Sequence, residues 1–493
     1  MFKCIDIINT KHTFKGVLKM TDKFNPNYYS NLEDDSAMIQ AAVDAAAEYG
    51  EAVTIPRFNE RTGEPIWIIE RAIRLHSGSI IYLNNCHLRQ ADNVIENIFK
   101  NSNNGTPEGF TREGRQSNII IQGFGNCLLD GGNHNGMTEV NCEEYGHPSA
   151  YENCMFNFLN VEQVKVRNIR ITHQRYWSFV FHYSSHVQIS EINYYAPYHW
   201  RNQDGVDIRS GCSHFLIENI TGVLGDDVVA LTNLKNQFED PMKDCHYDDS
   251  IHNVVIRNLR CTTKYSFVRI LNHGGRKIYN VLAQDLMFDC ESDPKDPRPG
   301  KYVEAGKYEP IHPEIYQFTQ DYGIRIGTYN YNLGESFAQY GDTYNITIRN
   351  LTCRGKVGVC MSCTAKDVLI DNVRMYGHGA TGIYVAQGPM RNIQVRDVYC
   401  SGHPDDDFDD RLYECEKDGR ELDFATLPDR QVCAVYFKNS DVRDMYIRDL
   451  HVGDAYTSVF GGFGDVEVDV TGLRKELDET PLNTGVGIKV NEK

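Results

Sequence analysis

VKVRNI at residues 164–169 and MYIRDL at residues 445–450 are the first and last of nine similar segments that decide the fold. Each segment is a short alternation of apolar and polar residues, followed by Asn or an acidic residue and then an aliphatic residue. The segments between them are VQISEI, FLIENI, VVIRNL, VLAQDL, ITIRNL, VLIDNV and IQVRDV. Their equivalent positions are Asn168, Glu191, Asn219, Asn258, Asp285, Asn350, Asn372, Asp397 and Asp449.

The spacing of these segments predicts a solenoid. The shortest intervals between equivalent positions are 22 to 28 residues, and no helical pattern lies between the strands. Short alternating strands at a fixed period are typical of stacked β coils, and the leucine spacing of leucine-rich repeats is absent. We therefore expect an all-β fold, a single right-handed parallel β-helix, in which equivalent residues form columns about 4.8 Å apart from coil to coil.

The sequence predicts one domain over residues 1–493. A helix within residues 34–56, capped by Asp35 or Ser36 and ended by Gly50, covers the first strand. We expect an N-terminal segment over 1–56 that contains this capping helix, β-helix coils over 57–460 and a C-terminal tail over 461–493. Longer intervals between segments indicate loop insertions at residues 233–250, 290–317 and 403–430.

The composition is that of a folded, soluble protein, with 41% hydrophobic and 24% charged residues. A net charge of −18 argues against nucleic-acid binding. The chain has no apolar run long enough for a membrane span and no N-terminal secretory signal. We expect a cytoplasmic protein, or an extracellular one if a signal has been removed, with a homo-oligomer compatible with the sequence. The 15 cysteines, including the C-x-x-C of Cys360 and Cys363, are expected to be buried thiols.

Three carboxylates stand out in NQDGVDIRS (202–210) and GDDVVAL (225–231). They are Asp204 and the adjacent pair Asp226 and Asp227. The pair alone is typical of a solvated turn. Placing the strands in register puts Asp207, Ala230, Arg269 and Arg325 in one column, and Asp204, Asp227, Ser266 and Tyr322 in the next. The alignment thus predicts three convergent carboxylates flanked by two arginines.

At these residues the chain resembles glycoside hydrolase family 28, the polygalacturonase-like hydrolases, which have the pectin-lyase type of right-handed β-helix. NQDGVDI resembles the first family block, GDDVVAL the second and GIRIGTY (323–329) the last, while RYWSFVFH (175–182) resembles its aromatic segment. In YSFVRILNHGGR (265–276), Ser266 stands where the family has a histidine, and Gly327 replaces its lysine. The Gly-His-Gly of residues 377–379 lies in the wrong coil and is interpreted as a chance match.

The resemblance implies hydrolysis of an α-linked oligosaccharide, pectin-like or neutral, with inversion. Asp226 is the implied general acid, while Asp204 and Asp227 activate water. Carboxyl groups of inverting enzymes stand roughly 6.5–9.5 Å apart. No metal or other cofactor is implied. The residues expected to bind substrate are Arg325, Arg269, Asn202, Trp200 and His273.

Several alternatives remain open at this stage. Asp207 is expected to anchor an arginine, and His273 is otherwise a loop histidine without a role. The aromatic residues Trp177, Tyr198 and Trp200 either stack on sugars or pack in the core. A β-helix lyase or epimerase that uses calcium, and a non-catalytic carbohydrate-binding β-helix, are the competing functions. The acidic run at residues 405–410 is either a cation site or solvated charge.

Overall fold

A computed structural model describes most of the chain as two compact units. The described residues are 22–139, 141–147, 149–196, 202–235, 242, 245, 247–263, 265–288, 300–304, 307–310, 322–327, 338–353, 357–376, 381–401 and 432–493. Unit 1 comprises the described residues of 1–180 and 184–195, and unit 2 comprises those of 181–183 and 196–493. The single-domain organisation over residues 1–493 stays a prediction.

Unit 1 begins with helix α2 (Asp35–Tyr49), whose buried face is made of Met38, Ile39, Ala42, Val43 and Ala46. Its cap is one residue earlier than expected, because Asp34 accepts the hydrogen bond from the Ala37 N–H at 2.8 Å. Gly50, at φ 68°, ends the helix as expected. The other elements are η1 (Pro26–Tyr29), β1 (Ala52–Ile55), β2 (Trp67–Ile69), β3 (Ile73–Leu75), β4 (Ile80–Asn84), β5 (His87–Gln90), β6 (Phe99–Asn101), η2 (Glu108–Phe110), β7 (Gln116–Phe124), β8 (Leu128–Asp130), η3 (Cys142–Tyr145), η4 (Ala150–Asn153), β9 (Phe156–Leu159), β10 (Val161–Thr172) and β12 (Ser185–Tyr195).

Strands dominate unit 2, and they continue through the C-terminal segment 461–493. Strand β11 (Phe179–His182) is divided between the units. The remaining strands are β13 (Val206–Ile208), β14 (Ser213–Leu224), β15 (Val229–Asn233), β16 (Ile251–Thr263), β17 (Ser266–Asn272), β18 (Ile278–Phe288), β19 (Gly300–Glu304), β20 (Lys307–Pro310), β21 (Tyr322–Gly327), β22 (Thr343–Cys353), β23 (Val357–Ser362), β24 (Ala365–Met375), β25 (Thr381–Ala386), β26 (Met390–Cys400), β27 (Cys433–Val452), β28 (Ser458–Thr471), β29 (Arg474–Lys475) and β30 (Val486–Glu492).

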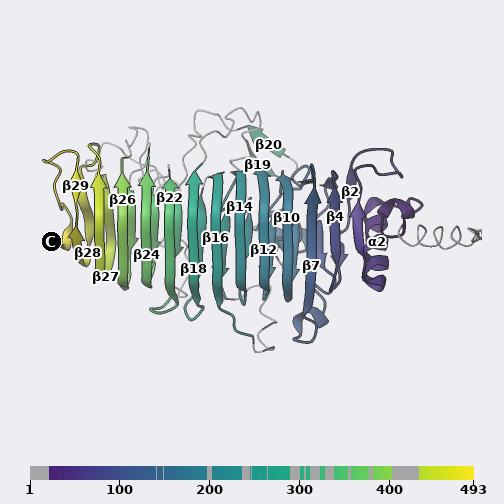
Figure 1. The fold of residues 1–493 in the computed structure, drawn as a ribbon, viewed down its shortest axis with the longest axis horizontal. Coiled ribbons are helices and arrows are strands. Elements are labelled where there is room, and N and C mark those ends of the chain that lie inside the picture. Colours follow the sequence, from purple (N-terminus) through teal and green to yellow (C-terminus); the bar gives the residue numbers. More distant parts are fainter. Residues whose placement is uncertain are drawn as a thin grey trace, which may run out of the picture. The chain divides into compact units, whose positions relative to one another are not determined.

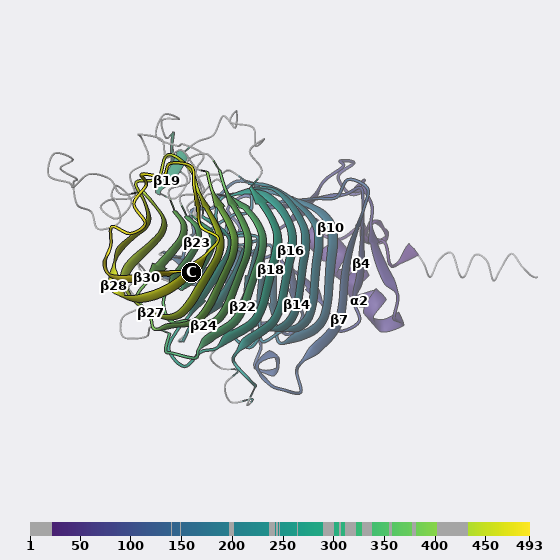
Figure 2. The ribbon, with the colours of Figure 1, turned by 60° about the vertical axis from the view of Figure 1, so that its left-hand side comes forward.

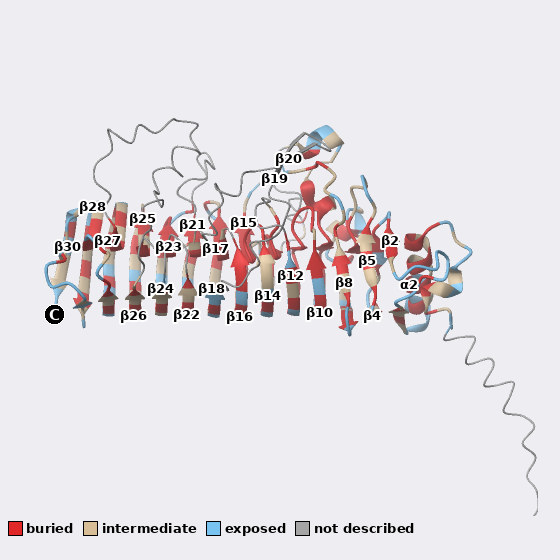
Figure 3. Ribbon diagram, turned by 90° about the horizontal axis from the view of Figure 1, so that it is seen from above, coloured by how far each residue is buried: buried red, intermediate tan, exposed pale blue. Residues whose placement is uncertain are grey.

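The long strands of unit 2 form a parallel ladder, so the expected right-handed parallel β-helix fold is confirmed. Figure 1 shows β14, β16, β18, β22, β24 and β26 side by side. Strands β15, β17, β21, β23 and β25 pair in a second parallel series and lie on the other side in Figure 3. Inward residues repeat in register, such as Ile256, Ala283 and Ile348, and stack into a buried aliphatic column.

Each coil bends at the positions that define the sequence repeat. All nine equivalent positions, from Asn168 to Asp449, have φ between 51° and 59°. A second set, which the sequence analysis missed, lies five residues earlier in each coil and is also left-handed. It comprises Gln163, His186, His214, Asn253, Asn280, Asn345, Asp367, Asn392 and Asp444. Asn and Asp tolerate this conformation better than most residues, which explains the repeat. Figure 2 shows the long strands of unit 2 as nested arcs.

Side-chain hydrogen bonds join the bends of successive coils in unit 2. The Asn280 Nδ2 donates to Asn253 Oδ1 at 3.0 Å and its Oδ1 accepts from Asn345 Nδ2 at 2.6 Å. In the other column, Asn372 donates to Asn350 at 2.9 Å, and Asn350 donates to Asp285 at 2.7 Å. These ladders fix the register of the coils at their outer edge.

The twelve described cysteines are free thiols, and all but Cys245 are buried, as expected. None of the helices in the described ranges is long and apolar enough to cross a membrane. Most of the three expected insertions, the Gly-His-Gly segment and the acidic run at 405–410 fall outside the described residues.

Replacing Asn280 by Val should lower the free energy of unfolding by about 2–3 kcal/mol. A β-branched residue is strained at φ 55°, and both ladder hydrogen bonds are lost. Asn280→Gly loses the same bonds without the strain, so urea unfolding should place it between Asn280→Val and the wild type. Equal stability of the two variants would mean that left-handed strain is not the cause.

Candidate active site

Four parallel strands of unit 2 carry the candidate site. Strands β13, β15, β17 and β21 pair so that Asp207, Ala230, Arg269 and Arg325 are register partners. Ser266 pairs with Tyr322 in the neighbouring column. The columns predicted from the sequence alignment are therefore confirmed for these residues.

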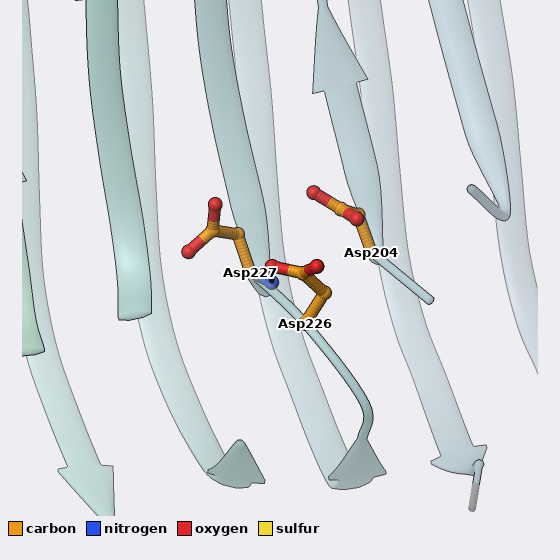
Figure 4. Close-up of side chains that lie close together, drawn as sticks. All are labelled: Asp204, Asp226 and Asp227. Atoms are coloured by element: carbon orange, nitrogen blue, oxygen red, sulfur yellow. Dashed lines mark hydrogen bonds between the residues drawn. The ribbon is translucent and has the colours of Figure 1, made fainter. Parts of the chain in front are cut away.

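The three predicted aspartates meet at the start of these strands. Asp204 precedes β13, while Asp226 and Asp227 precede β15. One carboxylate oxygen from each lies within 4.8 Å of the others, and all three residues are less than 9% exposed. Figure 4 shows Asp226 and Asp227 leaving one segment and Asp204 approaching from its neighbour. The 4.8 Å is the separation of the nearest oxygens, whereas the roughly 6.5–9.5 Å of inverting enzymes refers to the carboxyl groups, so inversion stays a prediction.

Backbone groups hold Asp226 in place. Its Oδ2 accepts from the Asn202 N–H at 2.7 Å and its Oδ1 accepts from the Asp227 N–H at 2.9 Å. The Thr263 hydroxyl donates to the Asp226 carbonyl. Asn202, two residues before Asp204, has a left-handed backbone conformation with φ 60°. Asn202, predicted to bind substrate, thus positions Asp226 through its main chain, and its contact with substrate stays a prediction.

Asp227 has a different set of partners. The Ser266 hydroxyl donates to its Oδ1, and Arg269 Nη1 lies 3.6 Å from its Oδ2. The guanidinium of Arg325 also favours its ionised form. Ser266, at the position of the family histidine, therefore contacts the carboxylate directly. The replacement is visible in the sequence, whereas the contact between Ser266 and Asp227 was not predicted from it.

Burial makes these carboxyl groups unusually weak acids. It is the largest cause that raises the pKa of Asp226 to about 7, and repulsion from Asp227 adds to it. Burial also raises the pKa of Asp204 well above its usual value, and that of Asp227 more moderately because Arg269 and Ser266 oppose it. A carboxyl group that carries a proton near neutral pH suits a general acid. The pKa is raised for both Asp204 and Asp226, so the choice between them as the general acid rests on the family resemblance.

A fourth carboxyl group, that of Asp207, lies in β13, in register with Arg269 and Arg325. It is buried, and burial raises its pKa well above the usual value, while the positive charge of Arg209 opposes the shift most. This agrees with the expectation that Asp207 interacts with an arginine. The arginine is two residues along the chain, directly after the end of β13.

The two arginines of the site stand one coil apart. Arg269 and Arg325 are register partners, and the Arg325 guanidinium lies 4.9 Å from the centre of the Tyr322 ring. Gly327, at the lysine position of the family, has φ 78°, and a Cβ there would lie 2.4 Å from the Cβ of Cys363. The local packing thus excludes any side chain at position 327.

The remaining predicted residues lie apart from the aspartates or outside the described chain. His273 follows β17, where its Nδ1 accepts from the Lys235 N–H at 2.8 Å. Trp200 and Tyr198 fall outside the described residues. Trp177, in unit 1, is buried and packs on Tyr176 and Tyr151 with ring centres 4.7 and 5.6 Å away, as in the core-packing alternative.

Among the described residues, Asp204, Asp226 and Asp227 are the only group of three or more His, Cys, Asp or Glu side chains whose ligand atoms lie close enough together to hold a metal ion. Hard cations such as Ca²⁺ prefer such oxygen ligands. Arg269 already supplies a positive charge beside Asp227, which reduces the electrostatic need for a cation. The arrangement is therefore compatible with an acid–base site and, chemically, with a calcium-dependent site.

Part of this site, namely the three aspartates and Ser266, lies in the part of the chain that matches a known family. Residues 99–267 match the profile of Glycosyl hydrolases family 28, so the resemblance to this family is confirmed. A search of curated proteins finds no match. The family match supports a glycoside hydrolase.

Solved structures with the same fold include the tailspike protein of E. coli bacteriophage HK620, determined with a hexasaccharide. It is 10% identical, with 93% of this chain and 76% of that chain covered and a TM-score of 0.55. The polygalacturonase of Erwinia carotovora is 14% identical, with 94% of each chain covered and a TM-score of 0.45. The exopolygalacturonase of Thermotoga maritima is 11% identical, with 95% and 91% covered and a TM-score of 0.42. At 10% identity the likeness to the tailspike protein concerns the fold alone.

Asp226→Asn should stabilise the protein at alkaline pH. Because the pKa of Asp226 is raised in the folded state, its protonated form favours folding, and this advantage is lost as the pH rises from about 4 through about 7. Relative to the wild type, the variant should therefore gain up to about 4 kcal/mol between pH 4 and pH 8, against a pH-independent cost, because its Nδ2 cannot accept one of the two backbone N–H bonds.

Thermal unfolding across pH 4–8 measures this difference. Asp465→Asn removes a carboxylate whose side chain is 81% exposed and serves as the control, with little change expected. A constant gap between Asp226→Asn and the wild type from pH 4 to pH 8 would contradict the raised pKa.

Proposed function

We propose that this protein is a glycoside hydrolase that cleaves an α-linked bond in an acidic, pectin-like oligosaccharide with inversion. The observation that carries the proposal is the convergence of Asp204, Asp226 and Asp227 within 4.8 Å beside Arg269. Both arginines and all three aspartates belong to segments that resemble the family blocks. We place the reaction in the cytoplasm as part of the same proposal.

Asp226 is the proposed general acid. It transfers its proton to the glycosidic oxygen as the bond to the anomeric carbon breaks, so that the leaving sugar departs as a neutral alcohol. A pKa of about 7 keeps a large fraction of this group protonated at neutral pH. Its two backbone hydrogen bonds, from Asn202 and Asp227, hold the carboxyl group in one orientation.

Asp204 and Asp227 are proposed to activate the water that attacks the anomeric carbon. A water that donates hydrogen bonds of about 2.8 Å to two oxygens holds them roughly 4.5 Å apart, which agrees with the short spacing of this pair. Asp204 Oδ1 is buried and has no hydrogen-bond partner among the described residues, so it can accept such a bond. The water loses its proton to this pair and supplies the new hydroxyl group.

Arg269 and Arg325 are proposed to bind a carboxylate of the substrate. Guanidinium groups one coil apart, about 4.8 Å, can share one planar anion through charge-assisted hydrogen bonds. In this proposal Arg269 supplies the charge that the family lysine would provide at position 327. The acidic character of the substrate follows from these two residues.

Two other reactions are each supported by a specific observation. A retaining reaction, in which one aspartate attacks the sugar directly, needs carboxyl groups about 5–5.5 Å apart, and the nearest aspartate oxygens here lie within 4.8 Å of one another. The oxygen-rich group also suits a calcium-dependent lyase, which would give unsaturated products. The anomeric form of the product and its ultraviolet absorbance separate the three reactions.

Asp226→Asn should lower kcat by at least about 1,000-fold, because the leaving oxygen no longer receives a proton. We would incubate the wild type and the variant with a panel of α-linked uronate and neutral oligosaccharides, and follow products by NMR. Inverted, saturated products from the uronates are expected, with no effect of EDTA. Full activity of Asp226→Asn, or an unsaturated product, would overturn the proposal, and Asp465→Asn is the matched control.

Ser266→Ala should shift the acidic limb of the kcat/KM profile to higher pH and reduce kcat/KM about tenfold. The Ser266 hydroxyl lowers the pKa of Asp227, so its loss leaves less of the ionised carboxylate that activates water. Ser266→Thr keeps the hydroxyl and should restore the profile. A fall in kcat without movement of the acidic limb would indicate a packing role only.

A further inference from the structure

Two cysteines of unit 1, Cys86 and Cys127, stand side by side in successive coils. Each directly precedes a strand, β5 or β8, and the first residues of these strands, His87 and Leu128, are register partners. The Leu128 N–H donates to the Cys86 carbonyl at 2.9 Å, so the parallel pairing extends back to the cysteines. Cys86 and Cys127 therefore occupy equivalent positions of neighbouring coils.

A hydrogen bond joins the two thiols. It is the largest cause that raises the pKa of Cys86 well above its usual value, and the largest cause that lowers the pKa of Cys127. Cys86 is thus the donor and Cys127 the acceptor, which makes Cys127 the first of the two to lose its proton. Each residue is only 1% exposed, so water competes little for this contact.

The spacing of the coils suits a disulfide between these cysteines. Equivalent residues of neighbouring coils lie about 4.8 Å apart, and disulfides join residues whose Cα atoms are about 4.4–6.8 Å apart. Equivalent side chains of parallel strands point the same way, so the two Cβ atoms are neighbours as well. A bond between the two sulfurs therefore needs no change in the register of the coils.

A second column of sulfur-containing residues shows what simple packing looks like in this fold. Cys353 and Cys400 of unit 2 are both buried, and Met375 lies between them as the register partner of each. These thiols fill space as small apolar side chains do. The direct contact between Cys86 and Cys127 adds the possibility of redox chemistry.

Exposed turn residues give an oxidant a way to the pair. Cys86 directly follows the exposed Asn84 and Asn85, and Cys127 directly follows the exposed residues 124–126. One side-chain contact joins the two turns, since the Asn126 N–H donates to Asn85 Oδ1 at 3.1 Å. Local opening of these turns, without unfolding of the coils, is enough to expose the sulfurs.

We propose that Cys86 and Cys127 form a reversible disulfide that links the first coils of unit 1. The oxidant is a small disulfide such as oxidised glutathione. The Cys127 thiolate attacks one of its sulfurs and releases the first small thiol, and Cys86 then attacks the Cys127 sulfur and releases the second. The protons of both cysteines pass to the departing thiolates, so two protein thiols and one small disulfide become one protein disulfide and two small thiols.

The bond should stabilise unit 1 because it closes a loop around a whole coil. The chain between the two cysteines contains β5, β6, η2 and β7, and a link across such a loop restricts the unfolded chain. Oxidation also removes the weak contacts of the Cys127 thiol with the Leu83 and Phe124 carbonyls at 2.9 and 3.2 Å. A thiol is a poor donor, so this loss is the smaller of the two effects.

Equilibration of the full chain in glutathione buffers of increasing oxidised fraction tests the proposal. After prolonged incubation, the remaining thiols would be blocked under denaturing conditions and linked peptides sequenced by tandem mass spectrometry. We expect a bond between Cys86 and Cys127 that dithiothreitol removes. The oxidised protein should melt at least about 4 °C above the reduced protein.

Three variants assign the effect to this pair. Cys86→Ala and Cys127→Ala should each lose both the bond and the shift in melting temperature, whereas Cys353→Ala, which removes a buried thiol of unit 2, should keep them. Absence of the bond in the most oxidising buffer, or a bond without a rise in melting temperature, overturns the proposal. The comparison of oxidised with reduced wild type needs no variant, so it stands even where a variant does not fold.

Discussion

Two left-handed residues in each of the nine repeated segments are the constraint on which the rest of this structure depends. A coil can close only if its long strand bends twice, and each bend needs a positive φ that most side chains resist. Asparagine and aspartate meet this need, and in unit 2 their amides also bond from coil to coil, as Asn280 does with Asn253 and Asn345. The ladder at the outer bends therefore sets the register of the strands, and the register decides which side chains share a column.

The candidate site is a product of that register. Asp204 and Asp227 come from segments one coil apart, and their proximity depends on Val206 and Val229 being partners. A shift by a single residue would turn Asp207 and Arg269 into the core and expose Val268. The buried carboxyl groups are held against their own repulsion by the scaffold, with Arg269, Ser266 and backbone N–H groups offsetting part of the cost. Stability of the coils and protonation of the site are thus coupled.

Much of this arrangement could be predicted from the sequence, because in a solenoid the residues that align between successive strands also stack on one another in the structure. The column of Asp207, Arg269 and Arg325 followed from aligning three short strands. The second bend was missed because Gln163, His186 and His214 obscure its asparagine pattern. Side-chain contacts were also out of reach: the bond from Ser266 to Asp227 and the short spacing of the carboxylates depend on rotamers. The environment of His273 was hidden for a related reason, since it depends on loop residues that no repeat aligns.

The glycine at position 327 restricts the routes by which this site can change. A lysine cannot be regained there by one substitution, because any Cβ would collide with Cys363, and the backbone of residues 362 and 363 lies only 3.0 Å away. Removal of the Cys363 side chain would have to come first and would still leave the backbone contact. A lysine at position 327 therefore requires coordinated changes in the packing of residues 362 and 363. In this sequence, positive charge beside the aspartates comes from Arg269 instead.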